Sequence, residues 1–378
     1  MSLLEQVDWV KLIDTGTQHY VLPLLYWTLN RDYSEHVPVP VLWFLKNCFL
    51  ENVDAANALA NEMVAIVNTL KIEGIDAVPF KGPALSVTVY GNIALRQIGD
   101  LDILIRKRDR LLARRVLESR SYRLKTPIDD GGAPKEIGKF EYQFEQTGGI
   151  TAELRWRVTQ RQFASSLDLD FIWNRCEPTI LAGAEVPGIA PEDLLLILCV
   201  HGAKHCWSRL MWICDVAELI RAFPQLDWKQ THRRASRLGI WRVTSLGLLL
   251  AESLLDAAVP EVLLAEARRD TTTVRLRDVI LGEMFHPSAE FPESQYHILI
   301  LERRRDRFWQ TARSLPRWVL PNERDRDFLS LPSSLQLAYF LIRPFRLVYE
   351  YVWAPQRSQK LRNDSRSHPT PESDDSES

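Results

Sequence analysis

The sequence predicts an α+β protein in which a small mixed β-sheet core is flanked by N-terminal and C-terminal helical regions. Three observations predict this class. Apolar residues recur at spacings of three and four up to residue 70, short apolar runs between turn residues follow, and helical spacing returns from residue 190. With 378 residues, the chain is long enough for two or three domains.

The N-terminal helical region is predicted to cover residues 1–70. One apolar face continues from Val41 to Leu70, and Gly74 then ends the pattern. The apolar run at residues 77–80 stops at Lys81-Gly82-Pro83, which indicates a buried strand followed by a turn. Residues 84–90 predict a short helix.

The predicted core continues to residue 185. Residues 99–105 have the pattern of a second strand, and residues 108–119 have that of a charged amphipathic helix. Residues 140–146 and 150–158 predict a hairpin around Gly148-Gly149. This mixture differs from a regular succession of β-α-β units.

A C-terminal helical domain is predicted for residues 186–310. Its first helix is predicted to begin at Pro191, because proline suits the first turn of a helix and the next two residues are acidic, which favours a helix N-terminus. A helical extension is expected at residues 311–355, and its aromatic-rich part, 335–353, is predicted to pack on the helical domain, with contact to a membrane surface as the minority interpretation. Residues 356–378 are rich in Ser, Asp, Arg, Glu and Pro, which predicts a disordered tail.

Charge and cysteine content limit the possible partners and compartment. Lys and Arg total 47 against 49 for Asp and Glu, a net charge of -2, so no broad DNA binding is expected. The five cysteines include no CxxC pair, which favours a reducing, cytoplasmic location. The N-terminus has no basic segment followed by an apolar run, so no signal peptide is expected.

Two aspartates are the first candidates for chemistry. Asp100 and Asp102 are two residues apart on a predicted strand, so they share a face while Leu101 and Ile103 point to the other. Paired carboxylates on a buried strand repel each other, and a divalent cation such as Mg²⁺ relieves that repulsion. The alternative is an edge strand with a solvated acidic face.

A third carboxylate lies on the later predicted strand. From Ile150 to Val158 the alternation is regular and places Glu153 on the polar face. Glu153 would complete a metal site or act as a base toward an acceptor hydroxyl. The alternative is a surface glutamate paired with Arg155 or Arg157.

These segments together resemble the uncharacterised nucleotidyltransferase family of the polymerase-β-like superfamily. The resemblance extends over roughly residues 60–310 and includes residues 201–210. The segments that carry it are Lys81-Gly82, Arg96, Gly99-Asp100-Leu101-Asp102 and Glu153-Leu154-Arg155-Trp156.

The resemblance implies transfer of a nucleoside monophosphate from an NTP, such as ATP, to an acceptor hydroxyl. Asp100 and Asp102 would hold Mg²⁺, with Mn²⁺ as an alternative, and Glu153 would be third ligand or base. Lys81, Gly82 and Arg96 would bind the triphosphate. Arg96 would otherwise be a permanent partner of one of the two aspartates. The acceptor stays open among a small molecule, a sugar and a protein.

One departure from the family pattern motivates a second hypothesis. The superfamily's turn usually reads Gly-Ser or Gly-Gly, whereas Gly82 is followed here by Pro83, which has no N–H to offer a phosphate. The alternative function is therefore a catalytically inactive nucleotide-binding or regulatory protein on the same scaffold.

His201 and His205 are four residues apart on a predicted helix and so share a face. Three interpretations stay open. They form a zinc site with Asp215, they belong to a phosphate- or acceptor-facing helix with Lys204 and Arg209, or they have a hydrogen-bonded structural role.

Overall fold

The computed structural model describes residues 6–129, 131–135, 140–157, 170–286 and 293–302. The chain divides into two units, Met1–Asp306 and Arg307–Ser378, and the described residues all belong to the first. The predicted helical extension at 311–355 and the tail at 356–378 therefore lie outside the described residues. The predicted domain boundaries stay predictions.

The N-terminal region is helical, as its apolar spacing predicts. Asp8 caps the first helix, since its side chain accepts a hydrogen bond of 3.0 Å from the backbone N–H of Lys11. The helices here are α1 (Trp9–Gln18), α2 (Leu22–Asp32), a 3-10 turn η2 (Ser34–His36) and the long α3 (Val39–Ile72). The C-terminal half of α3 packs on the sheet through Met63, Ile66 and Leu70, which are fully buried.

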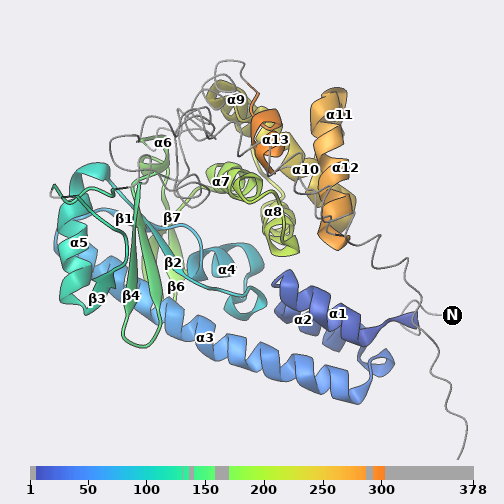
Figure 1. Cartoon of the computed structure of the whole chain (residues 1–378), viewed down its shortest axis with the longest axis horizontal. Helices are drawn as coiled ribbons and strands as arrows, with labels where there is room; N and C mark the ends of the chain where they lie inside the picture. Colours follow the sequence, from blue (N-terminus) through green and yellow to red (C-terminus); the bar gives the residue numbers. More distant parts are fainter. Residues whose placement is uncertain (1–5, 130, 136–139, 158–169, 287–292, 303–378) are drawn as a thin grey trace, which may run out of the picture. The chain divides into compact units, whose positions relative to one another are not determined.

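A five-stranded mixed sheet forms the core, which confirms the predicted fold class. Its strands are β1 (Ala77–Pro79), β2 (Leu101–Ile105), β3 (Tyr122–Leu124), β4 (Glu141–Gln146) and β5 (Thr151–Arg155). Their order is β1-β2-β5-β4-β3, and only β2 and β5 pair in parallel. Helices α3 and α5 (Arg110–Ser119) lie over one face (Figure 1).

Several short elements connect the strands. They are α4 (Pro83–Tyr90), η3 (Ile93–Leu95), η4 (Lys107–Asp109) and α6 (Asp170–Trp173). A separate hairpin of β6 (Glu177–Leu181) and β7 (Ala184–Gly188) is absent from the sequence-based prediction. Each of these strands contains a proline, Pro178 and Pro187, a residue that argues against a strand when only the sequence is known.

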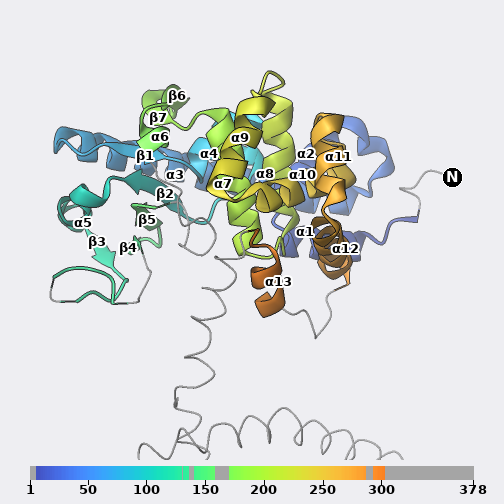
Figure 2. The ribbon, with the colours of Figure 1, turned by 90° about the horizontal axis from the view of Figure 1, so that it is seen from above.

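The C-terminal region is helical and begins at Pro191, as predicted. Its helices are α7 (Pro191–Lys204), α8 (Leu210–Ala222), α9 (Trp228–Leu238), α10 (Trp241–Leu255), α11 (Glu261–Arg269), α12 (Thr271–Phe285) and α13 (Glu293–Leu299). Helices α7, α8 and α10 pack against one another (Figure 2). In the part of the chain that the structure describes, no helix has the length and apolarity needed to span a membrane.

The helical region shares its apolar core with the sheet. Val78 of β1, Leu104 of β2 and Leu85 of α4 belong to the same buried cluster as the inner faces of α7, α8 and α10. Helix α4 contacts both β6 and α8 (Figure 1). The second face of the sheet is therefore closed partly by helices rather than left to solvent.

Candidate active site

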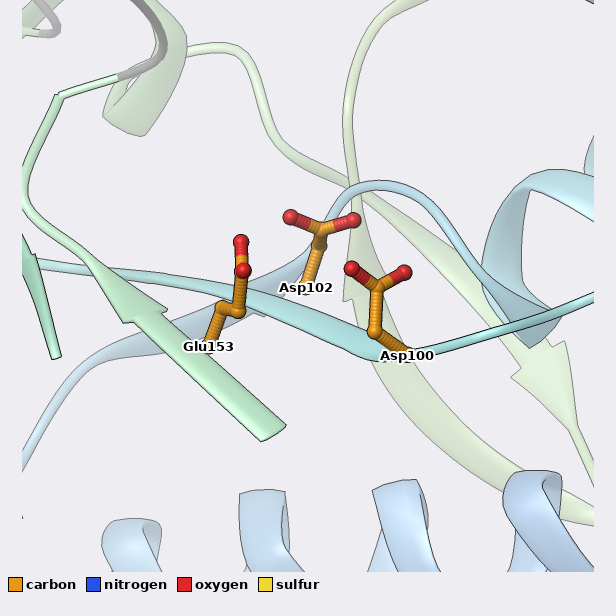
Figure 3. A group of neighbouring side chains, drawn as sticks. All are labelled: Asp100, Asp102 and Glu153. Atoms are coloured by element: carbon orange, nitrogen blue, oxygen red, sulfur yellow. The ribbon is translucent and has the colours of Figure 1, made fainter. Parts of the chain in front are cut away.

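Three carboxylates meet on this second face of the sheet. Asp102 lies directly opposite Glu153 in the parallel register of β2 and β5, and Asp100 immediately precedes β2. One ligand oxygen from each of the three lies within 4.8 Å of the others. Figure 3 shows all three side chains on the same side of the sheet. The predicted proximity of Asp100, Asp102 and Glu153 is confirmed.

Strand alternation explains this placement. Leu101, Ile103 and Leu154 are fully buried in the core beneath α3 and α5, so the intervening side chains must leave the sheet on the opposite side. Asp102 has no exposed surface, and β2 lies between β1 and β5. The alternative of an edge strand with a solvated acidic face is therefore wrong.

Two cations approach Asp102. The Lys81 ammonium lies 2.7 Å from Oδ2 of Asp102, and Nε of Arg155 lies 2.9 Å from Oδ1. These ion pairs are the contacts of both oxygens of this fully buried carboxylate, and no backbone N–H or neutral side chain among the described residues donates to them. A buried carboxylate with unused lone pairs is the kind of group that a hard cation such as Mg²⁺ binds.

The third carboxylate is held on both oxygens. Gln143 donates a hydrogen bond of 2.7 Å to Oε1 of Glu153, and Nη2 of Arg155 donates to Oε2. Glu153 therefore pairs with Arg155, as one prediction had it, but only 6% of Glu153 is exposed, so it is not a surface residue.

Two further residues of β4 belong to this layer, and the sequence analysis missed both. Gln143 lies directly opposite Glu153, and Glu141 lies directly opposite Arg155, whose Nη1 approaches Glu141 to 2.9 Å. The hairpin at residues 140–158 was predicted, and its register would have placed Glu141 and Gln143 beside the polar face of β5.

The two aspartates have opposite pKa shifts. Burial, followed by the nearby charge of Asp102, raises the pKa of Asp100 to about 6. Burial acts on Asp102 in the same direction, but Lys81 and Arg155 outweigh it and hold the pKa of Asp102 below its usual value. In the metal-free protein, Asp102 therefore stays ionised to a lower pH than Asp100, which carries the unrelieved repulsion.

Gly82 sets the distance between the β1–α4 turn and the aspartates. Its φ is +59°, in the left-handed region, and a Cβ at this position would lie 2.7 Å from the backbone carbonyl oxygen of Asp100. Only glycine fits here without a shift of the backbone. The turn that carries Lys81 is thus packed directly against the chain that carries Asp100.

Arg96 pairs with a carboxylate other than Asp100 or Asp102, its expected carboxylate partners. Its Nε and Nη2 bind Asp215 of α8 at 2.9 and 3.1 Å, and the Tyr90 hydroxyl donates to the same carboxylate at 2.8 Å. Arg96 is 6% exposed and Asp215 1%. This buried pair ties the loop before β2 to the helical region, and two of the three guanidinium nitrogens are committed to it. The phosphate-binding role of Arg96 stays a prediction.

The end of α7 faces the carboxylate layer. The rings of His201 and His205 lie 4.9 Å apart, and both contact Trp212. Burial and then Lys81 lower the pKa of His201, and burial and then Lys204 lower that of His205 to about 4, so both are neutral near pH 7. Burial and then Arg155 lower the pKa of Lys204.

A zinc site at these histidines is not formed. Among the described residues, Asp100, Asp102 and Glu153 are the one group of three or more ligand-type side chains close enough to share a metal ion. Asp215, the third residue of the zinc hypothesis, is occupied by Arg96 and Tyr90. The histidines instead form a neutral aromatic cluster with Trp212.

The group of three carboxylates on the mixed sheet is consistent with the nucleotidyltransferase class that the sequence resembles. The chain belongs to the uncharacterised nucleotidyltransferase family, whose profile matches residues 5–256, about two thirds of the sequence.

A comparison with solved structures gives similarity to the crystal structure of an antigenic nucleotidyltransferase-like protein from Paracoccidioides brasiliensis. That protein is 19% identical, and the match covers 50% of this chain and 88% of that chain with a TM-score of 0.29. No curated protein matches the sequence.

Proposed function

We propose that the protein transfers a nucleoside monophosphate from an NTP to an acceptor hydroxyl, with Mg²⁺ or Mn²⁺ bound by Asp100 and Asp102. The observation that carries this proposal is the group of three carboxylate oxygens within 4.8 Å of one another on β2 and β5. Family membership supports an NTP as the substrate. The acceptor stays open among a small molecule, a sugar and a protein.

The residues of the site suit such a cation. Asp102 offers buried oxygens that contact Lys81 and Arg155 and keep further lone pairs for a metal. Asp100 lies beside it with a pKa of about 6, so a cation would favour the ionised form of Asp100. When bound, the metal would neutralise phosphate charge and stabilise the charge that develops during transfer.

The protein's own cations would orient the triphosphate. Lys81 precedes the turn at Gly82, and its ammonium lies within the carboxylate group, where it can exchange a carboxylate partner for a phosphate oxygen. The turn also opens α4, whose first backbone N–H groups are suited to anions. Pro83 removes one of these donors, which leaves Lys81 a larger share of phosphate binding.

Label transfer tests the proposal. The full chain is incubated with each α-³²P-NTP, Mg²⁺ or Mn²⁺, and a cell extract as the source of acceptors. We expect label in an acceptor with the wild type and none with Asp102→Asn, because the latter lacks one buried metal ligand. Equal labelling by both proteins would contradict the proposal.

One observation favours a second function, nucleotide binding without transfer. Lys81 and Arg155 already neutralise Asp102 in the absence of metal. Calorimetry with ATP separates the two functions. Affinity that is unchanged by Mg²⁺ would support the regulatory function, and affinity that requires Mg²⁺ would support the enzyme.

A further inference from the structure

The Arg155 guanidinium makes three ion pairs with three different carboxylates. Nε lies 2.9 Å from Asp102, Nη1 lies 2.9 Å from Glu141, and Nη2 binds Glu153. The strands dictate this geometry, because Glu153 is two residues away on the same face of β5 and Glu141 is the cross-strand partner of Arg155. Arg155 is 7% exposed, and its pKa is raised because these carboxylates outweigh the effect of burial.

Arg155 therefore bridges Asp102 and Glu153, and a divalent cation shared by these two carboxylates would have to displace it. Both oxygens of Glu153 already accept a hydrogen bond, Oε1 from Gln143 and Oε2 from Arg155, so a metal would have to compete with a donor at either oxygen. Releasing Glu153 to a metal would leave a buried arginine without one of its partners, which is strongly unfavourable.

Lys81 is held far less firmly. It has one ion pair, to Oδ2 of Asp102, and an ammonium on a flexible stem leaves such a contact more readily than a guanidinium fixed at three points. One oxygen of Asp102 also lies within 4.8 Å of an oxygen of Asp100, close enough for both to share a cation. A cation that enters between the aspartates would displace Lys81 and leave Arg155 in place.

The charges of the layer favour a divalent cation. Asp100, Asp102, Glu153 and Glu141 are the carboxylates of the layer, and Lys81 and Arg155 are the cations in contact with them. Four negative and two positive charges leave two negative charges in the metal-free layer.

We propose that the site takes one divalent cation, at Asp100 and Asp102, and that Arg155 permanently occupies the place of a second cation between Asp102 and Glu153. This inference rests on the proposed nucleotidyltransferase function. It makes Arg155 a positioning residue that fixes Glu153, and it makes Lys81 the exchangeable cation.

Mn²⁺ titration of the full chain, followed by the electron paramagnetic resonance signal of the free ion, tests the inference without an activity measurement. We expect one bound Mn²⁺ per chain. Asp102→Asn should abolish binding, whereas Glu153→Gln should keep one bound ion and lose no more than about 10–100-fold in affinity, the effect of a residue that acts through a ligand rather than as one. Glu145→Gln, a surface change on β4, controls for net charge.

Two more variants separate the cations. Lys81→Met should keep one Mn²⁺ and bind it about ten-fold more tightly or better, because a competing cation is gone. Arg155→Met should bind two Mn²⁺ per chain, provided that it folds. If it does not fold, the stoichiometries of Lys81→Met and Glu153→Gln decide whether the site takes one cation.

Two bound Mn²⁺ in the wild type, or loss of Mn²⁺ in Glu153→Gln, would overturn the inference and leave the proposed transfer reaction intact. No Mn²⁺ binding by the wild type, with or without a non-hydrolysable NTP, would overturn both. Label transfer by a protein that binds a single Mn²⁺ would support both.

Discussion

Asp100 and Asp102 are separated by one residue, yet their surroundings shift their pKa values in opposite directions. Asp102 lies between Lys81 and Arg155 and keeps its charge despite complete burial. Asp100 has neither cation as an ion-pair partner and is exposed to the charge of Asp102. In the metal-free site, Asp100 is therefore destabilised by burial and by electrostatic repulsion, which is the strain at this residue.

This strain predicts a pH-dependent gain in stability for Asp100→Asn. The folded-state pKa of Asp100, about 6, lies above its usual value of 3.8, so the contribution of Asp100 to stability is fully present at low pH and lost as the pH rises through about 6. With a chelator present, Asp100→Asn should melt at a higher temperature than the wild type at pH 7.5. The difference should vanish below about pH 4.

Melting curves between pH 4 and 8 check this expectation. Asp14→Asn, an exposed position on α1, is the control and should follow the wild type at every pH. A difference that does not change with pH would mean that the charge of Asp100 is not its source. The groups that act on Asp100 are Asp102, Lys81, Glu153 and Arg155.

Arg96 leads to a second prediction at the residue scale. Because it is buried and bound through two nitrogens to buried Asp215, Arg96→Met should lower the free energy of unfolding by about 3–5 kcal/mol. Arg268→Met, which breaks a more exposed pair with Glu252, should cost about 1 kcal/mol or less.

Urea unfolding of the two variants measures both values. Adding Asp215→Asn to Arg96→Met should recover part of the loss, because the uncompensated buried charge is then removed. An Arg96→Met protein of wild-type stability that binds NTP poorly would instead restore Arg96 to the phosphate-binding role expected from the sequence.

Helix α7 ends in a packing arrangement that explains two glycines inside helices. The indole of Trp207 is fully buried against Gly202 of α7 and Gly247 of α10. A Cβ on Gly202 would come within 2.4 Å of the indole ring, and one on Gly247 would come within 2.8 Å of Cys199 Sγ. This packing of Trp207 supports the helix end that carries His201 and His205.

Gly202→Ala should therefore destabilise the protein, by about 1–3 kcal/mol, although alanine is the better helix former. Gly282→Ala is the matched control, since Gly282 lies within α12 with nothing near the position of a Cβ. That variant should gain about 0.5–1 kcal/mol. Chemical denaturation of both variants checks the signs. A stabilised Gly202→Ala would show that the indole ring can move aside.

The sequence predicted individual helices and strands better than it predicted which of them lie side by side. The strand at Asp102, the hairpin that carries Glu153 and the helix that starts at Pro191 are all confirmed, because each depends on local periodicity and turn residues. The parallel pairing of β2 with β5 joins segments about 50 residues apart, and no local pattern specifies it.

The same limit explains why the sequence did not identify which carboxylates pair with the site's cations. The partner of Lys81 is Asp102 and that of Arg96 is Asp215. The phosphate contacts expected for both residues stay predictions. Those partners depend on which strands and helices are adjacent. Residue types and alternation identified the carboxylates, and only the tertiary arrangement identified the cations that hold them.

Across the whole molecule, the sheet and the C-terminal helices share one apolar core. Val78, Phe80 and Leu104 come from the predicted core of residues 71–185, yet they are buried in the same cluster as Leu195, Trp207 and their neighbours in the predicted helical domain. The Arg96–Asp215 pair crosses the same boundary. Each side of the boundary near residue 185 thus buries surface that it cannot bury alone.

We therefore expect the sheet and the C-terminal helices to unfold together. Hydrogen exchange pulse labelling of the full chain across a urea series should give the same midpoint for peptides from β2 and β5 as for peptides from α7 and α10.

Leu104→Ala, which creates a cavity in the shared cluster, should cost about 2–5 kcal/mol and lower the midpoint of both regions equally. Leu101→Ala, in the cluster beneath α3, is the matched control and should also lower both midpoints, because cooperative unfolding spreads the loss of stability over both regions wherever it arises.

Two separate midpoints, with Leu101→Ala moving only that of the sheet, would show instead that the boundary near residue 185 divides two independently folding domains. In that case the carboxylate layer would retain its geometry after the helices unfold, and Mn²⁺ would still bind at the urea concentration between the two midpoints. Joint unfolding requires that Mn²⁺ binding be lost in the same transition as the protection of α7.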